Sequence, residues 1–157
     1  MKHWTNPVTG QSIPVADLHG ATLCAAAVAA LQGMLRSSGI NADALAVVQA
    51  HVAAVRTGDP ELMAADYAPQ ALITRGLKVV APRAYFPGVA LRLGGSRLVV
   101  SSITIAPPTG TVPDVSTVTM HWQLAGGRAN RTCGTDTFVV RADRIVQQTV
   151  VLHTADF

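Results

Sequence analysis

The second half of the chain constrains the fold most, because long segments there alternate between apolar and polar residues. A period of two residues is typical of strands that bury one face. Turn-forming pairs separate the segments, namely Pro107-Pro108, Gly126-Gly127 and Ala142-Asp143. The pattern therefore predicts four strands, over Arg97 to Ala106, Val115 to Leu124, Ala129 to Arg141 and Ile145 to His153.

The first half of the chain is predicted to be mostly helical. Residues 1–14 are expected to form an irregular or extended arm, and capping and terminating residues mark the helices that follow it. These helices are expected over Asp17 to Arg36, Ala42 to Arg56 (capped by Asn41) and Pro60 to Tyr67.

Shorter elements connect the helices to the long strands. Ala71 to Thr74 and Leu77 to Val80 are expected to pair as strands around Gly76. Pro82 opens another helical piece, which Pro87-Gly88 should bend or interrupt. Helices followed by a largely antiparallel sheet predict an α+β fold. Such a sheet can curl around the helices, so that its concave face encloses a pocket.

The composition excludes several classes of protein. With 49% hydrophobic and only 13% charged residues, the 157-residue chain suits one globular domain with a sizeable core. Its 12 Lys and Arg residues are scattered, so the net charge of +3 does not indicate a nucleic-acid partner. The apolar run from Ala21 to Leu35 is too short to span a bilayer, and no secretory signal is recognisable.

The cysteines and glycines point to no metal and no cofactor. Cys24 and Cys133 lie apart from each other and from any histidine cluster. Both are predicted to be reduced, buried thiols of a cytoplasmic protein. No metal-ligand spacing and no phosphate-binding glycine loop is present in the sequence.

Asp136 breaks the apolar face of the third predicted strand. Because side chains alternate across a strand, Asp136 shares its face with Phe138 and Val140. A carboxylate on an apolar face must be paired, hydrogen-bonded or kept protonated. Asp136 is therefore either a structural member of a polar network or an acid that works in a pocket.

His51 is expected to point inward, and Arg75 is a further polar candidate. His51 lies on the apolar face of the second helix, with Val48 and Val55 at helical spacing. It is either a core histidine with one partner or an acid/base beside Asp136. Arg75 alternates with Ile73, so it either binds a substrate oxygen, forms a buried ion pair with Asp136, or ends the strand in solvent.

Large side chains on the same faces suit the walls of a hydrophobic pocket. Trp122 alternates with the apolar residues on either side of it, whereas His121 falls on the opposite, outer face. The candidate substrate-binding residues are Arg75, Trp122, Tyr67, Phe86 and Phe138, with Tyr85 as a further large side chain.

Three stretches of the chain carry a family resemblance. They are HVAAVRTGD from His51, YAPQALI from Tyr67 and TDTFVVRADRIV from Thr135. In these stretches the chain resembles the NTF2-like superfamily, which includes ketosteroid isomerases and SnoaL-like polyketide cyclases. The resemblance implies a cone-shaped α+β domain over residues 41–157, with residues 1–40 as an added arm and helix. It also implies a homodimer formed through the sheet.

The isomerase branch of that superfamily implies roles for individual positions. Counted through the similar stretches, the isomerase oxyanion Asp falls on Asp136 and the oxyanion Tyr falls on His51. The general-base Asp falls on Arg75, a cation. Steroid isomerisation by the usual mechanism is therefore not expected.

Two hypotheses for the function remain open from the sequence. The first is a cofactor-free isomerase, cyclase or dehydratase that acts on a compact hydrophobic carbonyl compound through Asp136 and His51. The second is a non-catalytic ligand-binding or dimeric assembly module of the same fold. Its interface would be the polar, uncharged face that carries Thr117, Thr119, His121 and Gln123.

Overall fold

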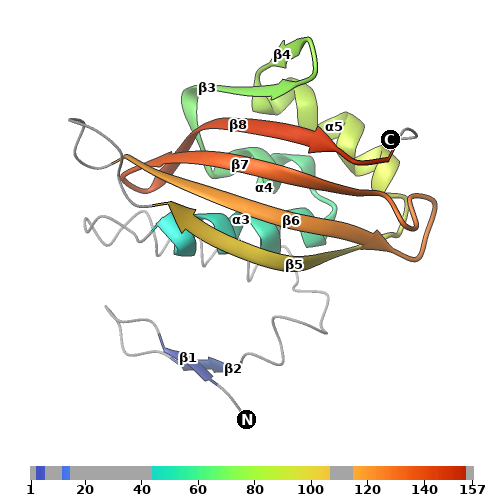
Figure 1. The fold of residues 1–157 in the computed structure, drawn as a ribbon, viewed down its shortest axis with the longest axis horizontal. Coiled ribbons are helices and arrows are strands. Elements are labelled where there is room, and N and C mark those ends of the chain that lie inside the picture. Colours follow the sequence, from blue (N-terminus) through green and yellow to red (C-terminus); the bar gives the residue numbers. More distant parts are fainter. Residues whose placement is uncertain (1–2, 6–11, 15–43, 107–114, 155–157) are drawn as a thin grey trace.

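The computed structural model describes residues 3–5, 12–14, 44–106 and 115–154 (Figure 1). The expected helix from Asp17 to Arg36, the cap Asn41, Cys24 and the Pro107-Pro108 turn lie outside these residues. In the amino-terminal arm, expected to be irregular or extended, β1 (His3–Thr5) and β2 (Ser12–Pro14) pair as antiparallel strands.

The fold is α+β and its main element is a six-stranded mixed sheet with the order β4-β3-β8-β7-β6-β5. Neighbouring strands are antiparallel except for β3 and β8, which are parallel. The strands are β3 (Tyr67–Arg75), β4 (Lys78–Val80), β5 (Arg97–Ala106), β6 (Val115–Ala125), β7 (Cys133–Arg141) and β8 (Arg144–Leu152). The expected strands are all confirmed.

The predicted start of β7 at Ala129 is wrong, because residues 129–132 belong to the preceding turn. Thr132 N–H donates to the carbonyl of Ala129 at 3.0 Å, and Arg131 has a φ of 70°. The left-handed Arg131 and this local bond prevent a regular ladder here, although the N–H of Arg131 and the carbonyl of Thr132 still hydrogen-bond Leu124 of β6.

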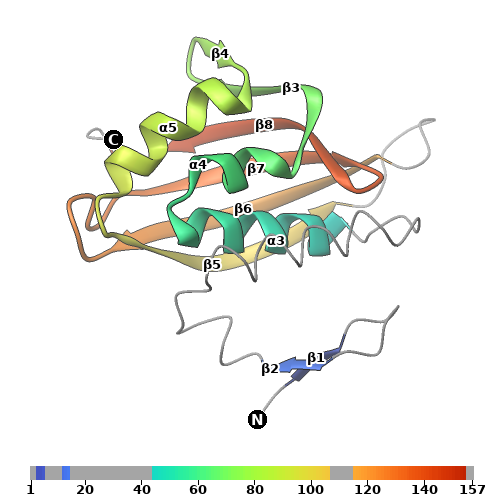
Figure 2. The same ribbon diagram turned by 180° about the vertical axis from the view of Figure 1, so that it is seen from behind.

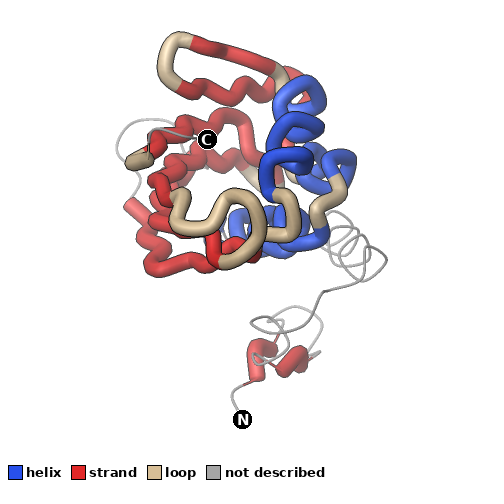
Figure 3. The backbone as a smooth tube through the Cα atoms, turned by 90° about the vertical axis from the view of Figure 1, so that its right-hand side faces the viewer, coloured by secondary structure: helices blue, strands red, loops and turns tan. Residues whose placement is uncertain are grey.

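In the described part of the chain, three helices cover one face of the sheet (Figure 2). They are α3 (Ala44–Thr57), α4 (Pro60–Ala65) and α5 (Pro82–Leu93). Gly58, with a φ of 74°, ends α3, and the carboxylate of Asp59 then caps α4 by accepting from the N–H of Glu61 at 2.9 Å. The end-on view shows the strands bending around these helices, as expected for a concave sheet (Figure 3).

Of the two outcomes expected at Pro87-Gly88, a bend or an interruption of α5, the interruption is wrong, since the helix continues to Leu93. A proline inside a helix removes the bond to the carbonyl four residues earlier, which here belongs to Arg83. Arg83, Pro87 and Gly88 are all exposed, so water can reach the region where that bond is lost.

The core lies between the helices and the concave face. Along β7 the inward side chains of Asp136, Phe138 and Val140 are buried, as their alternation predicted. His121 is exposed on the opposite face of the sheet, also as predicted.

Cys133 is a free thiol but is half-buried, so its predicted full burial is wrong. In the described residues, no helix has both the length and the apolar character needed to cross a membrane.

Candidate functional site

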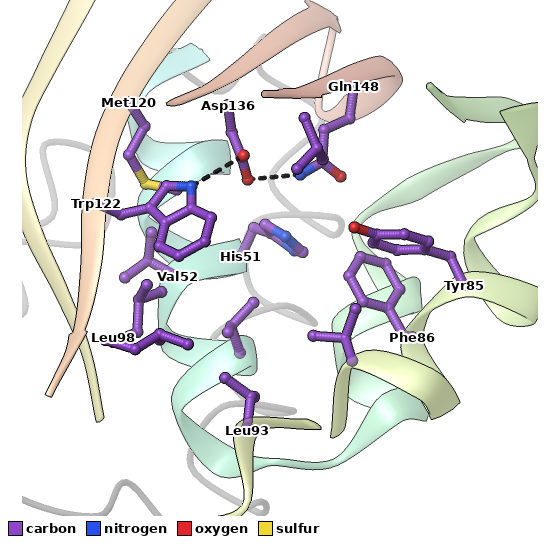
Figure 4. Close-up of a pocket in the computed structure, with 14 residues that line it drawn as sticks. His51, Val52, Tyr85, Phe86, Leu93, Leu98, Met120, Trp122, Asp136 and Gln148 are labelled. Carbon is purple, nitrogen blue, oxygen red and sulfur yellow. Dashed lines mark hydrogen bonds between the residues drawn. The ribbon is translucent and has the colours of Figure 1, made fainter. Parts of the chain in front are cut away.

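A cavity opens between α3, α5 and the concave face of the sheet (Figure 4). The cavity volume, counted as the space open to the centres of water molecules, is about 60 Å³. On the same measure one water requires roughly 10–15 Å³, so the cavity is several times larger than a single water needs. The lining residues Val55, Tyr85 and Val89 are half-buried, which places the mouth between α3 and α5. A cavity of this size suits a compact ligand.

Most of the cavity wall is apolar, with a small polar group at its inner end. Trp122 and Phe86 line the wall, together with Met120 and Leu98. The polar side chains at the inner end are Asp136, Gln148 and His51. A mainly apolar wall with a few convergent polar groups is typical of small-molecule sites.

Asp136 is held by two donors, one on each carboxylate oxygen. The indole N–H of Trp122 donates to Oδ1 at 2.9 Å, and the amide Nε2 of Gln148 donates to Oδ2 at 2.8 Å. The side chain is 8% exposed. Burial raises the pKa of Asp136 from 3.8 to about 6, although these two bonds and the charge of His51 act in the opposite direction. Near neutral pH the carboxyl group can therefore both give and take a proton.

A hydrogen-bonded chain connects Asp136 to His51. The hydroxyl of Tyr67 donates to Oε1 of Gln148 at 2.5 Å, and the same hydroxyl oxygen lies 3.3 Å from Nε2 of His51. Burial, followed by the charge of Asp136, raises the pKa of Tyr67 well above its usual range, so Tyr67 stays protonated. Asp136 and His51 both line the cavity but communicate through Gln148 and Tyr67, and no direct hydrogen bond joins them.

The direction of this chain determines the tautomer of His51. Tyr67 has a single hydroxyl proton and gives it to Gln148, so it must accept a hydrogen bond from the Nε2–H of His51. The other ring nitrogen, Nδ1, has no hydrogen-bond partner, and Oδ2 of Asp66 lies 3.7 Å away from it. This distance is too long for a hydrogen bond but short enough for charge attraction if His51 is protonated.

Arg75 faces the concave side of the sheet but does not pair with Asp136. In the strand register Arg75 lies beside Val150, and Val150 lies beside Asp136. Aligned residues of neighbouring strands point to the same face, so Arg75 and Asp136 flank Val150 on the concave side. Burial raises the pKa of Tyr85, and the nearby Arg75 acts against this rise. In the described part of the chain, the ion pair with Asp136 that would have quenched both groups is not formed.

The remaining predicted residues lie behind the cavity wall. Tyr67 and Phe138 are buried next to His51, with ring centroids 5.2 and 5.6 Å from the imidazole. They do not line the cavity, so neither is placed to contact a ligand directly. Sequence reasoning missed Gln148 and Asp66. Gln148 did carry a signal, since it lies two residues before the inward-facing Val150, whereas nothing in the sequence marks Asp66.

Metal ligands do not gather at this site. Among the residues that the structure describes, no group of three or more His, Cys, Asp or Glu side chains could hold a metal ion. The polar groups at the cavity can instead exchange protons and donate hydrogen bonds.

The fold is that of NTF2-like and cystatin-like proteins, as solved structures show. A protein of unknown function with a cystatin-like fold from Methylobium petroleophilum matches with a TM-score of 0.56 at 12% identity, over 71% of this chain and 76% of that one. An NTF2-like protein of unknown function from Cytophaga hutchinsonii matches with a TM-score of 0.50 at 7% identity, over 69% and 88%.

A third match has a TM-score of 0.54 at 17% identity and covers 72% of this chain and 86% of its counterpart. It is a Xanthomonas campestris protein provisionally assigned as a calcium/calmodulin-dependent protein kinase II association domain. No protein-family model matches the chain. No curated protein matches it either. At these identities the similarity establishes the fold alone.

Proposed function

We propose that this protein is a cofactor-free enzyme of the small-molecule-binding NTF2-like type, an isomerase, cyclase or dehydratase. Its substrate is a compact hydrophobic carbonyl compound that enters between α3 and α5. The observation that carries the proposal is Asp136 itself, a buried carboxyl that lines the cavity and whose pKa is raised to about 6. Perturbed carboxyl groups in clefts are typical of acid/base sites.

Asp136 supplies both halves of a proton transfer in this proposal. Its ionised form takes a proton from the carbon next to the substrate carbonyl, which leaves an enolate. The carboxylic acid then returns the proton to the substrate at another carbon or at the oxygen. Trp122 and Gln148 fix the carboxyl group in place during both steps. His51 acts through Tyr67 and Gln148 and serves as a positioning residue.

Proton exchange with solvent tests this function without knowledge of the natural substrate. Small ketones and aldehydes are incubated with the protein in D₂O, and deuterium uptake beside the carbonyl is followed by NMR. We expect accelerated exchange for a subset of them, reduced by about 10²–10⁴-fold in the Asp136→Asn variant. Exchange at the uncatalysed rate for every compound, or unchanged exchange in the variant, would rule out the mechanism.

A second candidate function is a dimeric assembly or ligand-binding module. The outer faces of β6 and β7 carry Thr117, Thr119, His121, Thr135 and Thr137, and the charged Arg141 lies at the end of β7. A polar, uncharged face pairs with a second copy of itself without charge repulsion. Sedimentation equilibrium tests this proposal. A dimer that dissociates in a Thr119→Lys variant supports it, and a wild-type monomer at high concentration contradicts it.

A further inference from the structure

In the described part of the chain, Asp136 brings a carboxyl group to the cavity and forms no ion pair. Its hydrogen-bond partners, the indole of Trp122 and the amide of Gln148, are both uncharged. Each carboxylate oxygen accepts one of these two bonds, and a carboxylate oxygen can accept a second one. When Asp136 is ionised, both of its oxygens can therefore still bind a donor that enters the cavity.

The buried titratable groups next to Asp136 do not use this capacity. His51 of α3 directs Nε2 toward the Tyr67 hydroxyl and Nδ1 toward Asp66, so neither ring nitrogen bonds to Asp136. Tyr67 of β3 donates to Gln148 instead. The carboxylate of Asp66, 3.7 Å from Nδ1, balances any positive charge on His51. The remaining acceptor positions of Asp136 are therefore available to a ligand.

Among the described residues that line the cavity, none is a lysine or an arginine. Arg75 lies on the same face of the sheet but two strands away from Asp136, and it does not line the cavity. Burial raises the pKa of Tyr85, which does line the cavity, so the Tyr85 hydroxyl stays neutral at neutral pH. The wall therefore offers a ligand the negative charge of Asp136 and no fixed positive charge.

Aromatic rings stand on two sides of the cavity (Figure 4). Trp122 lies on one side, and Tyr85 and Phe86, whose ring centroids are 5.4 Å apart, lie on the other. The face of an aromatic ring attracts a cation that comes within about 6 Å of its centre, and tryptophan does so most strongly. The aromatic wall and the carboxyl group therefore favour the same kind of ligand, an apolar body that carries one positive charge.

We propose that the cavity binds a compact organic ammonium ion, whose N–H groups donate to Asp136 and whose apolar body packs against Trp122 and Phe86. A carboxylate that has left water is costly unless a charged, hydrogen-bonded partner accompanies it, and the ammonium group is such a partner. A neutral molecule of the same shape fills the cavity but leaves this cost in place. The inference goes beyond the proposed function, because the amine is a ligand that occupies the place of the carbonyl substrate and undergoes no reaction.

Two matched probes test the ammonium site by isothermal titration calorimetry. Benzylamine is an ammonium ion at about pH 8, where Asp136 is ionised, whereas benzyl alcohol has nearly the same shape and no charge. We expect wild-type protein to bind benzylamine more tightly. Because a hydrogen bond to a charged group is removed, Asp136→Asn should weaken benzylamine binding by about 10–100-fold and leave benzyl alcohol binding nearly unchanged. Glu61→Gln, which removes an exposed acid in the first turn of α4, is the matched control and should keep the preference for the amine.

The pH provides a second measurement on the same proteins. At about pH 5 only about a tenth of the unliganded protein carries ionised Asp136, so the affinity for benzylamine should fall roughly tenfold between about pH 8 and pH 5. Asp136→Asn should lack this dependence, which separates the titration of Asp136 from that of His51.

Equal binding of the two probes to the wild type, or binding of neither, would overturn the ammonium site. An Asp136→Asn variant that keeps the full preference for benzylamine would also reject it, as would an equal loss in Glu61→Gln. These measurements require no turnover, so a failure here leaves the test of the proposed function by carbonyl exchange in D₂O unaffected.

Discussion

Replacing Asp136 by Asn should reverse the hydrogen-bonded chain that leads to His51. In the wild type, Gln148 donates to Asp136 and Tyr67 donates to Gln148. An asparagine can keep its oxygen toward Trp122 and present its NH₂ group to Gln148. If the Gln148 amide then flips, Tyr67 accepts from Gln148 and donates to Nε2 of His51. The proton of His51 then moves to Nδ1, where it faces Asp66.

The same substitution should stabilise the fold at neutral pH. The pKa of Asp136 is raised from 3.8 to about 6 by folding, and one pKa unit corresponds to about 1.4 kcal/mol. Because the pKa of Asp136 is higher in the folded state, its contribution to the free energy of unfolding is most favourable below about pH 4. This contribution falls as the pH rises through about 6. Ionised Asp136 therefore costs about 3 kcal/mol above about pH 7, and the neutral Asn avoids this cost.

Urea denaturation between about pH 4 and pH 8 measures the stability effect. We expect the two proteins to be nearly equal at the acid end and the variant to be more stable, by up to about 3 kcal/mol, at the alkaline end. The ¹⁵N chemical shifts of the His51 ring report its tautomer directly. Asp143→Asn, in the β7–β8 turn, is the control for removal of an acid outside the cavity.

A stability difference between wild type and Asp136→Asn that does not change with pH would refute the claim that burial raises the pKa of Asp136. An unchanged His51 tautomer in a folded variant would refute the reversal of the chain. The two measurements are independent, because the first reports the charge of Asp136 and the second reports the direction of the bonds between Gln148 and His51.

Three further substitutions test the packing around the site by urea denaturation. Tyr67→Phe leaves Oε1 of Gln148 without its donor and should destabilise the fold by about 1–3 kcal/mol; an equally stable variant would show that this bond contributes nothing. Gly134→Ala places a methyl group 2.7 Å from both the Trp122 ring and the carbonyl oxygen of Val151, so we expect a loss of about 1–3 kcal/mol and a shifted Trp122 fluorescence spectrum; an equally stable variant with an unchanged spectrum would contradict this close packing. Phe138→Ala removes a fully buried ring and should destabilise by about 3–5 kcal/mol, against a much smaller loss for the half-buried neighbour Val139→Ala; similar losses would contradict the assigned faces.

The sequence by itself determined the strands and the side of the sheet to which their residues point. The two-residue period placed Asp136 and Phe138 on the buried face, and helical spacing turned His51 inward. These inferences succeed because alternation and helical periodicity are local properties of the backbone. Turn boundaries were less predictable. Pro87 is tolerated inside α5, and Ala129 falls in a turn, because exposure and local bonds outweigh the sequence pattern there.

Only the tertiary structure decided which polar groups meet. Tyr67 and Gln148 are separated by 81 residues and become neighbours because β3 pairs in parallel with β8. The same pairing aligns Arg75 of β3 with Val150 of β8, and Val150 in turn lies beside Asp136 of β7. Sheet order depends on the burial of the whole apolar surface, and no local period encodes it. The sequence therefore marked Asp136 as an acid on the buried face, and the order of the strands surrounded it with Trp122, Gln148 and a cavity.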